Sequence, residues 1–190
     1  MDPTRAPGRR YRRRPHGEPV NPEWTAPPGP AGSLADAPPL DNPLAGVIGE
    51  TWQEYRRHAV QRRQPGFVLA EARNGGYLVG FAAGMPLRPS TSWWRELTTP
   101  LPDAVTAEHP GRTFAVVDLL VRASWRRQGI GRDLHDLILD GRPEERATLT
   151  VLPAAAAAQH ALRAWGWRKV ARAQAGPDAP VTDVLVIPLG

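Results

Sequence analysis

Residues 121–131, VRASWRRQGIG, are the most informative stretch of the chain. They join an apolar run, TFAVVDLLV at residues 113–121, to GRDLHDLILD at residues 131–140. The first run is typical of a buried strand, and the second places apolar residues at helical spacing. Residues 121–131 are therefore expected to form a tight turn that leads from a central strand into a helix.

Two glycines in this turn, Gly129 and Gly131, let the backbone approach a ligand and turn its N–H groups inward. The N-terminus of the following helix adds about half a positive charge. Together these features predict a site for an anion such as a pyrophosphate. Arg126, Arg127 and Arg132 add positive charge at its rim. The simpler alternative is a turn that needs its glycines for steric reasons alone.

Two common phosphate-binding motifs do not fit this turn. The dinucleotide-binding motif needs a third glycine and an acidic residue after the next strand, and both are missing here. The P-loop needs Gly-Lys followed by Ser or Thr, which is also missing. The turn therefore matches neither motif.

Composition divides the chain into two parts. Residues 1–40 hold many of the 22 prolines and very few large apolar residues, so we expect a disordered tail followed by one folded domain over residues 41–190. Residues 1–20 carry six arginines and two acidic residues, so they supply +4 of the total net charge of +5. A solvated tail is the simpler interpretation, and an arm that binds nucleic acid is the alternative.

Several classes of site are excluded by what the chain lacks. It has no cysteine, which rules out a disulfide framework, a cysteine nucleophile and a cysteine-based metal site. No apolar run approaches the roughly 20 residues that span a bilayer. We expect a cytoplasmic protein without a metal ion and without a membrane partner.

The remaining patterns predict an α/β (α+β) domain with a mixed sheet. A helix is expected from Asn42 and Pro43 to about residue 63, and a hairpin follows, with a turn at Asn74-Gly75-Gly76. A long irregular stretch is expected from Pro86 to Gly111, where five prolines interrupt the chain. The other expected elements are strands at 67–71, 77–84, 147–152, 167–171 and 181–189 and a helix at 153–165, with Gly166 as its cap.

The strand, the R-x-x-G-x-G pattern at residues 126–131 and the amphipathic helix together resemble the coenzyme A signature of the GNAT superfamily of N-acetyltransferases. The hairpin that ends in YLVGFAAG, residues 77–84, is similar to the family's second and third strands. ALRAWGW at residues 161–167 is similar to its late helix-to-strand junction. The resemblance covers roughly residues 42–190 and implies a mostly antiparallel, twisted sheet flanked by helices.

The resemblance also implies acetyl-CoA as co-substrate. Backbone groups at the end of the central strand would polarise the thioester carbonyl, as an oxyanion hole does. Backbone N–H groups of the turn would hold the pyrophosphate, and the acceptor amine would attack the thioester directly in a ternary complex. The implied cofactor-binding residues are Leu119, Leu120, Val121, Arg126, Arg127, Gln128, Gly129, Ile130, Gly131 and Arg132.

The chain departs from the family pattern at three positions. The family often has proline where Ala123 stands and glycine where Arg127 stands, and backbone contacts tolerate both changes. Many members place a tyrosine, which protonates the leaving thiolate, where this chain has Leu162. His160 does not replace it, because it lies about 200° further round the helix.

Asp118 is the first candidate for the general base that an acceptor ammonium requires. A carboxylate in an apolar strand is costly unless it is paired or functional. It would take the proton, bind the acceptor amine without taking a proton, or pair with an arginine, and these interpretations stay open. Glu108, in the preceding loop, is the second candidate.

Aromatic and histidine residues near these positions have mainly structural interpretations. Trp93 and Trp94 lie in the long loop, where they would line an acceptor pocket or anchor the loop. Trp165 and Trp167 are expected in the core. His135 is expected on a solvated helix face.

The function that these patterns favour is transfer of the acetyl group of acetyl-CoA to a primary amine, on a small molecule or a protein. The alternative is a module that binds coenzyme A but catalyses poorly, which Leu162 favours. Nucleic acid is not expected as a partner, and a homodimer is left open.

Overall fold

The computed structural model describes residues 65–74 and 77–190. The helix expected from Asn42 and the tail expected at residues 1–40 lie outside these residues. The described part contains β1 Val68–Asn74, β2 Tyr77–Pro86, α2 Asp103–Thr106, β3 Thr113–Val121, the 3-10 turn η2 Ala123–Trp125, α3 Ile130–Leu139, β4 Arg146–Val151, α4 Ala156–Ala164, β5 Arg168–Ala173 and β6 Thr182–Pro188.

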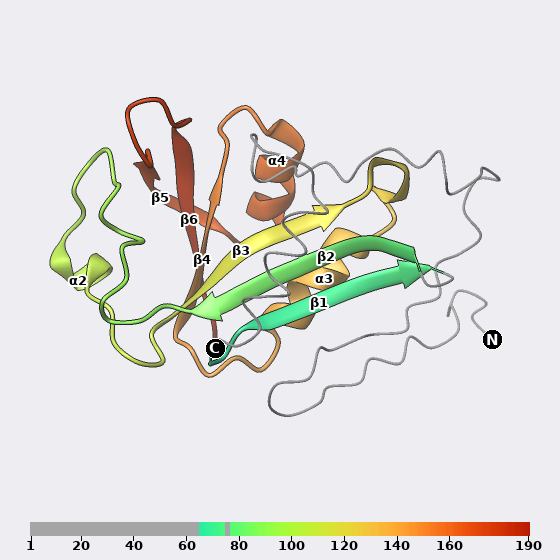
Figure 1. Ribbon diagram of the computed structural model, residues 1–190, viewed down its shortest axis with the longest axis horizontal. Helices are drawn as coiled ribbons and strands as arrows, with labels where there is room; N and C mark the ends of the chain where they lie inside the picture. The colour runs from blue at the N-terminus through green and yellow to red at the C-terminus, as the bar shows by residue number, and fades with distance from the viewer. Residues whose placement is uncertain (1–64, 75–76) are drawn as a thin grey trace.

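A single sheet carries all six strands, in the order β1-β2-β3-β4-β6-β5 (Figure 1). The pairing is antiparallel except between β3 and β4, where α3 provides the crossover that parallel neighbours need. The expectation of a mixed, mostly antiparallel sheet with helices is confirmed.

The main core lies on the face of the sheet that α3 and α4 cover. Leu134 and Ile138 of α3 and Leu162 of α4 pack there against side chains of the strands, among them Val121 and Leu149. Figure 1 shows α3 behind β1 and β2. Two smaller apolar clusters lie elsewhere, and one of them joins β3, β5 and β6 to the segment that follows β2.

That segment, residues 87–112, is the long stretch expected to be irregular, and most of it is. It contains the four-residue helix α2 and forms an isolated bridge between Leu97 and Ala173 of β5. Backbone hydrogen bonds from Thr98 to Arg172 (2.9 Å) and from Gln174 to Glu96 (2.8 Å) fasten it to the outer edge of β5. The segment therefore protects an edge strand as well as covering an apolar cluster.

The expected boundaries hold closely in the centre of the chain and less well later. The strand at residues 113–121 has the expected ends, and α3 begins one residue before its expected start. The helix expected at 153–165 is shorter: it begins at Ala156 and ends at Ala164. Gly166 follows in the left-handed conformation with φ +98°, as expected for a glycine that ends a helix. Within the described residues, no helix is long and apolar enough to cross a membrane.

Candidate functional site

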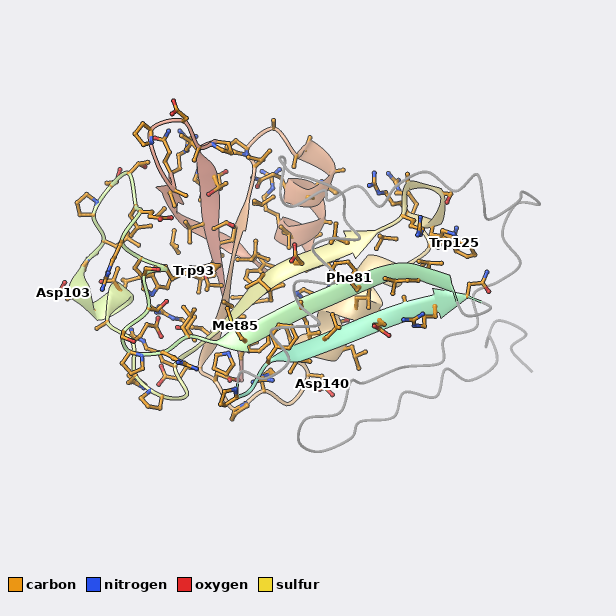
Figure 2. The ribbon with its side chains drawn as sticks, in the orientation of Figure 1. Phe81, Met85, Trp93, Asp103, Trp125 and Asp140 are labelled. Atoms are coloured by element: carbon orange, nitrogen blue, oxygen red, sulfur yellow. The ribbon has the colours of Figure 1, made fainter. Side chains whose placement is uncertain are left out.

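The turn between β3 and α3 is built by backbone geometry and braced by two arginines. Nε of Arg122 donates to the carbonyl of Leu78 at 2.8 Å, and Nε of Arg126 donates to the carbonyl of Val121 at 3.0 Å. Trp125, at the end of η2, is buried in the main core (Figure 2). These contacts hold the turn at the end of the central strand.

Two residues of the turn have positive φ angles, Arg127 at +64° and Gly129 at +86°. Arg127 is the position where the family often has glycine, so the structure gives a conformational reason for that preference. A Cβ atom added to Gly129 would meet nothing within 4 Å. Open space therefore lies against the backbone at the start of α3.

The amide groups at the start of α3 are placed to bind an anion. The first N–H of the helix that reaches a carbonyl is that of Asp133, which bonds to Gly129 O at 3.0 Å. The N–H groups of Ile130, Gly131 and Arg132 precede it, and no side chain caps the helix. With the open space at Gly129, these amides fit a phosphate or pyrophosphate.

Strands β3 and β4 are paired only at their first residues. Their parallel ladder joins Thr113 to Arg146, Phe114 to Ala147 and Ala115 to Thr148. β3 continues to Val121 and β4 to Val151. Among the described residues, the later part of β3 is therefore paired with β2 alone, and its other edge has no strand partner.

An irregularity in β3 lies next to Asp118. Gly84 of β2 pairs with Val116, and Ala83 pairs with Asp118, so Val117 is an extra residue on β3. A bulge of this kind re-aims neighbouring side chains and leaves a residue outside the ladder. Asp118 is 8% exposed and is not isolated, since it makes an interaction with its surroundings.

Glu108 is held by three donors on one of its carboxylate oxygens. Oε1 accepts from Trp94 Nε1 at 2.8 Å, from Thr113 Oγ1 at 2.8 Å and from Arg146 at 3.0 Å. Its side chain is 1% exposed, and Oε2 has no hydrogen-bond partner among the described residues. Thr113 lies five residues before Asp118, roughly 15 Å along a strand. The structure therefore does not bring the two candidate bases together.

The two adjacent tryptophans of the long segment differ in their surroundings. Trp94 is buried and bonded to Glu108, and the guanidinium of Arg146 lies 5.2 Å from its ring centroid. Trp93 is half-buried at the edge of the same apolar cluster, which includes Val117 (Figure 2). The indole N–H of Trp93 is buried without a hydrogen-bond partner in the described chain.

The expectation that His135 lies on a solvated helix face is wrong. His135 is 4% exposed, and its Nε2 accepts a 2.9 Å hydrogen bond from Trp167 Nε1. Its Nδ1 lies 2.7 Å from Asp136 Oδ1. Burial lowers the pKa of His135 below 6.5, and Arg132 adds to this, although Asp136 acts in the opposite direction. Trp167 is in the core as expected, and Trp165 is half-buried beside it.

A second polar cluster, which no pattern in the sequence predicted, joins α4, β5 and β6 at Asp183. Its carboxylate contacts Lys169 Nζ at 2.5 Å, Arg172 Nε at 3.3 Å and Gln159 Nε2 at 3.1 Å. Burial raises the pKa of Asp183, but these three partners outweigh it and bring the pKa below 3.8. Four scattered positions meet here, and no local sequence pattern connects them.

Leu162 is 1% exposed in the main core, whereas His160 is exposed. The position where many family members carry a hydroxyl is therefore occupied by a packed aliphatic side chain. Among the described residues, no group of three or more His, Asp or Glu side chains lies together in a way that would hold a metal ion.

The model of the acetyltransferase (GNAT) family matches residues 34–167, which is more than half of the chain. This chain belongs to the GNAT acetyltransferase family. The family uses acetyl-CoA as its co-substrate, and the open turn with its free amides fits the phosphates of that molecule.

Solved structures show the same fold at low sequence identity. The aminoglycoside 6'-N-acetyltransferase complexed with coenzyme A has a TM-score of 0.54 and 13% identity, over 74% of this GNAT chain and 85% of that chain. The ribosomal-protein-S18-alanine N-acetyltransferase from Escherichia coli has a TM-score of 0.53 and 14% identity, over 77% and 81%. Nourseothricin acetyltransferase has a TM-score of 0.50 and 21% identity, over 66% and 67%. No protein with a curated description matches the chain.

Proposed function

We propose that this chain is an N-acetyltransferase that transfers the acetyl group of acetyl-CoA to a primary amine. The observation that carries the proposal is the start of α3, where amides that bond to no carbonyl of the described residues border the open space at Gly129. This anion site directly follows the part of β3 that has no partner on its β4 side. One end of a long cofactor can therefore be held at the turn while its thioester lies along this edge of β3.

In this proposal the backbone of the turn binds the pyrophosphate and the backbone of β3 binds the acyl end. Leu119, Leu120 and Val121 lie opposite β2, and along such an antiparallel strand the backbone groups of successive residues point alternately toward β2 and away from it. The groups that point away from β2 supply contacts for the pantetheine arm and a donor for the thioester oxygen, which gains negative charge in the transition state. The turn residues 126–132 supply the remaining contacts.

Asp118 is the proposed general base. The acceptor nitrogen loses its proton to the carboxylate and attacks the thioester carbon, and the carbon–sulfur bond then breaks to release the thiolate. The bulge at Val117 supports this role, because it changes the direction of the strand beside the carboxylate. Leu162 supplies no proton to the thiolate, so the proton comes from solvent or from the acceptor.

Trp93 is the proposed acceptor contact, and Trp94 and Glu108 are proposed to hold the loop. Trp93 is partly exposed, its indole N–H has no partner among the described residues, and it packs against the same apolar cluster as Val117, which adjoins Asp118. Trp94 and Glu108 already bond to each other, and Glu108 also binds the first residues of β3 and β4. Glu108, the second candidate base, is thus better suited to anchoring.

The test is release of free coenzyme A thiol from acetyl-CoA with a panel of primary amines. The wild type is expected to show turnover with at least one amine, and Asp118→Ala is expected to lose most of it. Asp103→Ala is the control, because Asp103 is exposed in α2, away from the proposed site (Figure 2). Turnover that survives in Asp118→Ala would show that Asp118 is not the base.

A second candidate function is a module that binds coenzyme A but catalyses poorly. The buried Leu162, in place of a hydroxyl, favours it. This candidate predicts calorimetric binding of acetyl-CoA while no amine raises thiol release above hydrolysis. A pronounced increase with any amine would exclude it.

A further inference from the structure

We propose that His135, acting through Asp136, is a positioning residue for Arg132, whose guanidinium is one of the phosphate contacts of the proposed co-substrate site. The inference rests on the proposed function, since it concerns the same anion site. His135 is buried and has no part in the proposed acyl-transfer steps, so its role needs a separate explanation.

Arg132 is held on two sides before any ligand arrives. Its Nε donates to Asp136 Oδ2 at 2.7 Å, and its Cζ lies 5.7 Å from the ring centroid of Trp165. The bond to Asp136 uses Nε, so the two terminal nitrogens keep the paired geometry that binds phosphate oxygens. Arg132 is three residues after Gly129, in the first turn of α3. A restrained arginine loses less entropy on binding than a free one.

Asp136 is held in turn by His135. Trp167 Nε1 can only donate, so the 2.9 Å contact makes His135 Nε2 the acceptor and leaves the ring proton on Nδ1. That N–H donates to Asp136 Oδ1 at 2.7 Å. Both oxygens of the carboxylate are therefore engaged, one by the buried imidazole and one by Arg132. A continuous series of hydrogen bonds joins Trp167 in the core to Arg132 in the first turn of α3.

Stability alone explains this arrangement poorly. The side chains of Arg132 and Asp136 are 47% and 50% exposed, and an exposed ion pair at this helical spacing contributes little to stability. His135 is buried against Trp167 and bonds to Asp136, so it restrains the Asp136 carboxylate more than a weak surface ion pair requires. These hydrogen bonds have a function if they orient the guanidinium of Arg132.

The experiment compares three ligands: coenzyme A, 3'-dephospho-coenzyme A and pantetheine, which has no phosphate. Dissociation constants are measured for the wild type, Arg132→Gln, Asp136→Asn and Asp140→Asn. Asp140→Asn makes the same charge change one helical turn further from the anion site and serves as control. Asp136 is half exposed, so its variant is expected to fold.

We expect Arg132→Gln to weaken coenzyme A binding about tenfold, the effect of one charged hydrogen bond. Asp136→Asn is expected to weaken it several-fold, even though it removes a negative charge that repels phosphate. Pantetheine binding and the Asp140→Asn control are expected to stay unchanged. An Arg132→Gln effect that persists with 3'-dephospho-coenzyme A assigns the contact to the pyrophosphate, and one that disappears assigns it to the 3'-phosphate.

Equal or tighter binding of coenzyme A to Asp136→Asn would overturn the positioning role. Equal weakening of coenzyme A and pantetheine would overturn it too, because that pattern indicates a general structural defect. If the wild type binds none of the three ligands, the proposed function fails instead, so the two failures are distinguishable. His135→Gln should follow Asp136→Asn in this ligand pattern if the imidazole acts through the carboxylate.

Discussion

The indole N–H of Trp167 donates a 2.9 Å hydrogen bond to Nε2 of His135 and so joins the segment before β5 to the middle of α3. This bond requires a neutral imidazole, because a proton on Nε2 would face the indole N–H. The burial that lowers the pKa of His135 below 6.5 acts in the same direction.

The pH dependence of stability follows from this contact. The unfolded chain protonates this histidine near pH 6.5, whereas the folded chain protonates it only at lower pH. Its contribution is therefore complete above pH 6.5 and declines as the pH falls below that value. Urea unfolding between about pH 7.5 and pH 5 should show a smaller decline for His135→Gln than for the wild type. His160→Gln, at an exposed position, is the control; equal declines in all three proteins would contradict the assignment.

Arg127 offers a test of backbone strain. Its φ of +64° is unfavourable for a residue with a side chain, so Arg127→Gly should leave the free energy of unfolding unchanged or raise it by up to about 1 kcal/mol. Gln128→Gly, at a neighbour with negative φ, should lower it by about 0.5–1 kcal/mol. Chemical denaturation measures both. A loss of equal size in the two variants would show that Arg127 is not strained.

The two glycines of the turn should differ in what they tolerate. A Cβ on Gly131 would lie 3.7 Å from Val121 and 3.8 Å from Trp165, which is ordinary contact with the protein. Gly131→Ala should therefore change the dissociation constant of acetyl-CoA little and raise stability by about 0.5–1 kcal/mol, as alanine does in helices.

Gly129→Ala should weaken acetyl-CoA binding by about tenfold or more, because its methyl group enters the space proposed for the phosphates. It should also lose about 1 kcal/mol of stability, because φ is +86°. Gly129→Asn separates the two effects, since asparagine tolerates this conformation better but still fills the space. Calorimetry that finds normal binding in Gly129→Asn would place the phosphates elsewhere.

The adjacent tryptophans should separate stability from acceptor binding. Trp94→Phe removes one of the three donors to Glu108 Oε1 and should cost about 1.5–3 kcal/mol, the usual contribution of a hydrogen bond to a charged group. Trp93→Phe removes an N–H that bonds to nothing in the described chain, so stability should change little. The KM for the acceptor amine should rise in Trp93→Phe while the KM for acetyl-CoA stays constant. An unchanged acceptor KM would show that Trp93 only packs against the sheet.

Local patterns in the sequence were sufficient for the centre of the fold. The apolar run at residues 113–121 and the glycines after it define a strand, a turn and a helix start within a few neighbouring residues. Nothing local marks the bulge at Val117, because every residue around it except Asp118 is apolar. That irregularity depends on the register with β2, which is set by distant residues.

Contacts between distant residues explain the errors and omissions. His135 follows Leu134 on α3, and its polarity suggested an exposed position. Its partner Trp167 lies 32 residues later, beyond the reach of helical periodicity. The bond between Glu108 and Arg146 joins residues 38 positions apart, so the sequence could not predict it either. The ion pair of Arg132 and Asp136 could have been predicted from the sequence, because the two residues lie four positions apart on one helix.

Direct transfer of acetyl to an amine can be followed with acetyl-CoA that carries an isotopic label in its acetyl group. The labelled acetyl-CoA is incubated with the enzyme and an amine that supports turnover, and mass spectrometry is then applied to the amine and to the intact protein. We expect labelled acetyl on the amine, no label on the protein that can later pass to amine, and loss of the labelled product in Asp118→Ala. Label that first accumulates on the protein and then passes to the amine, or label found only in free acetate, would contradict direct transfer.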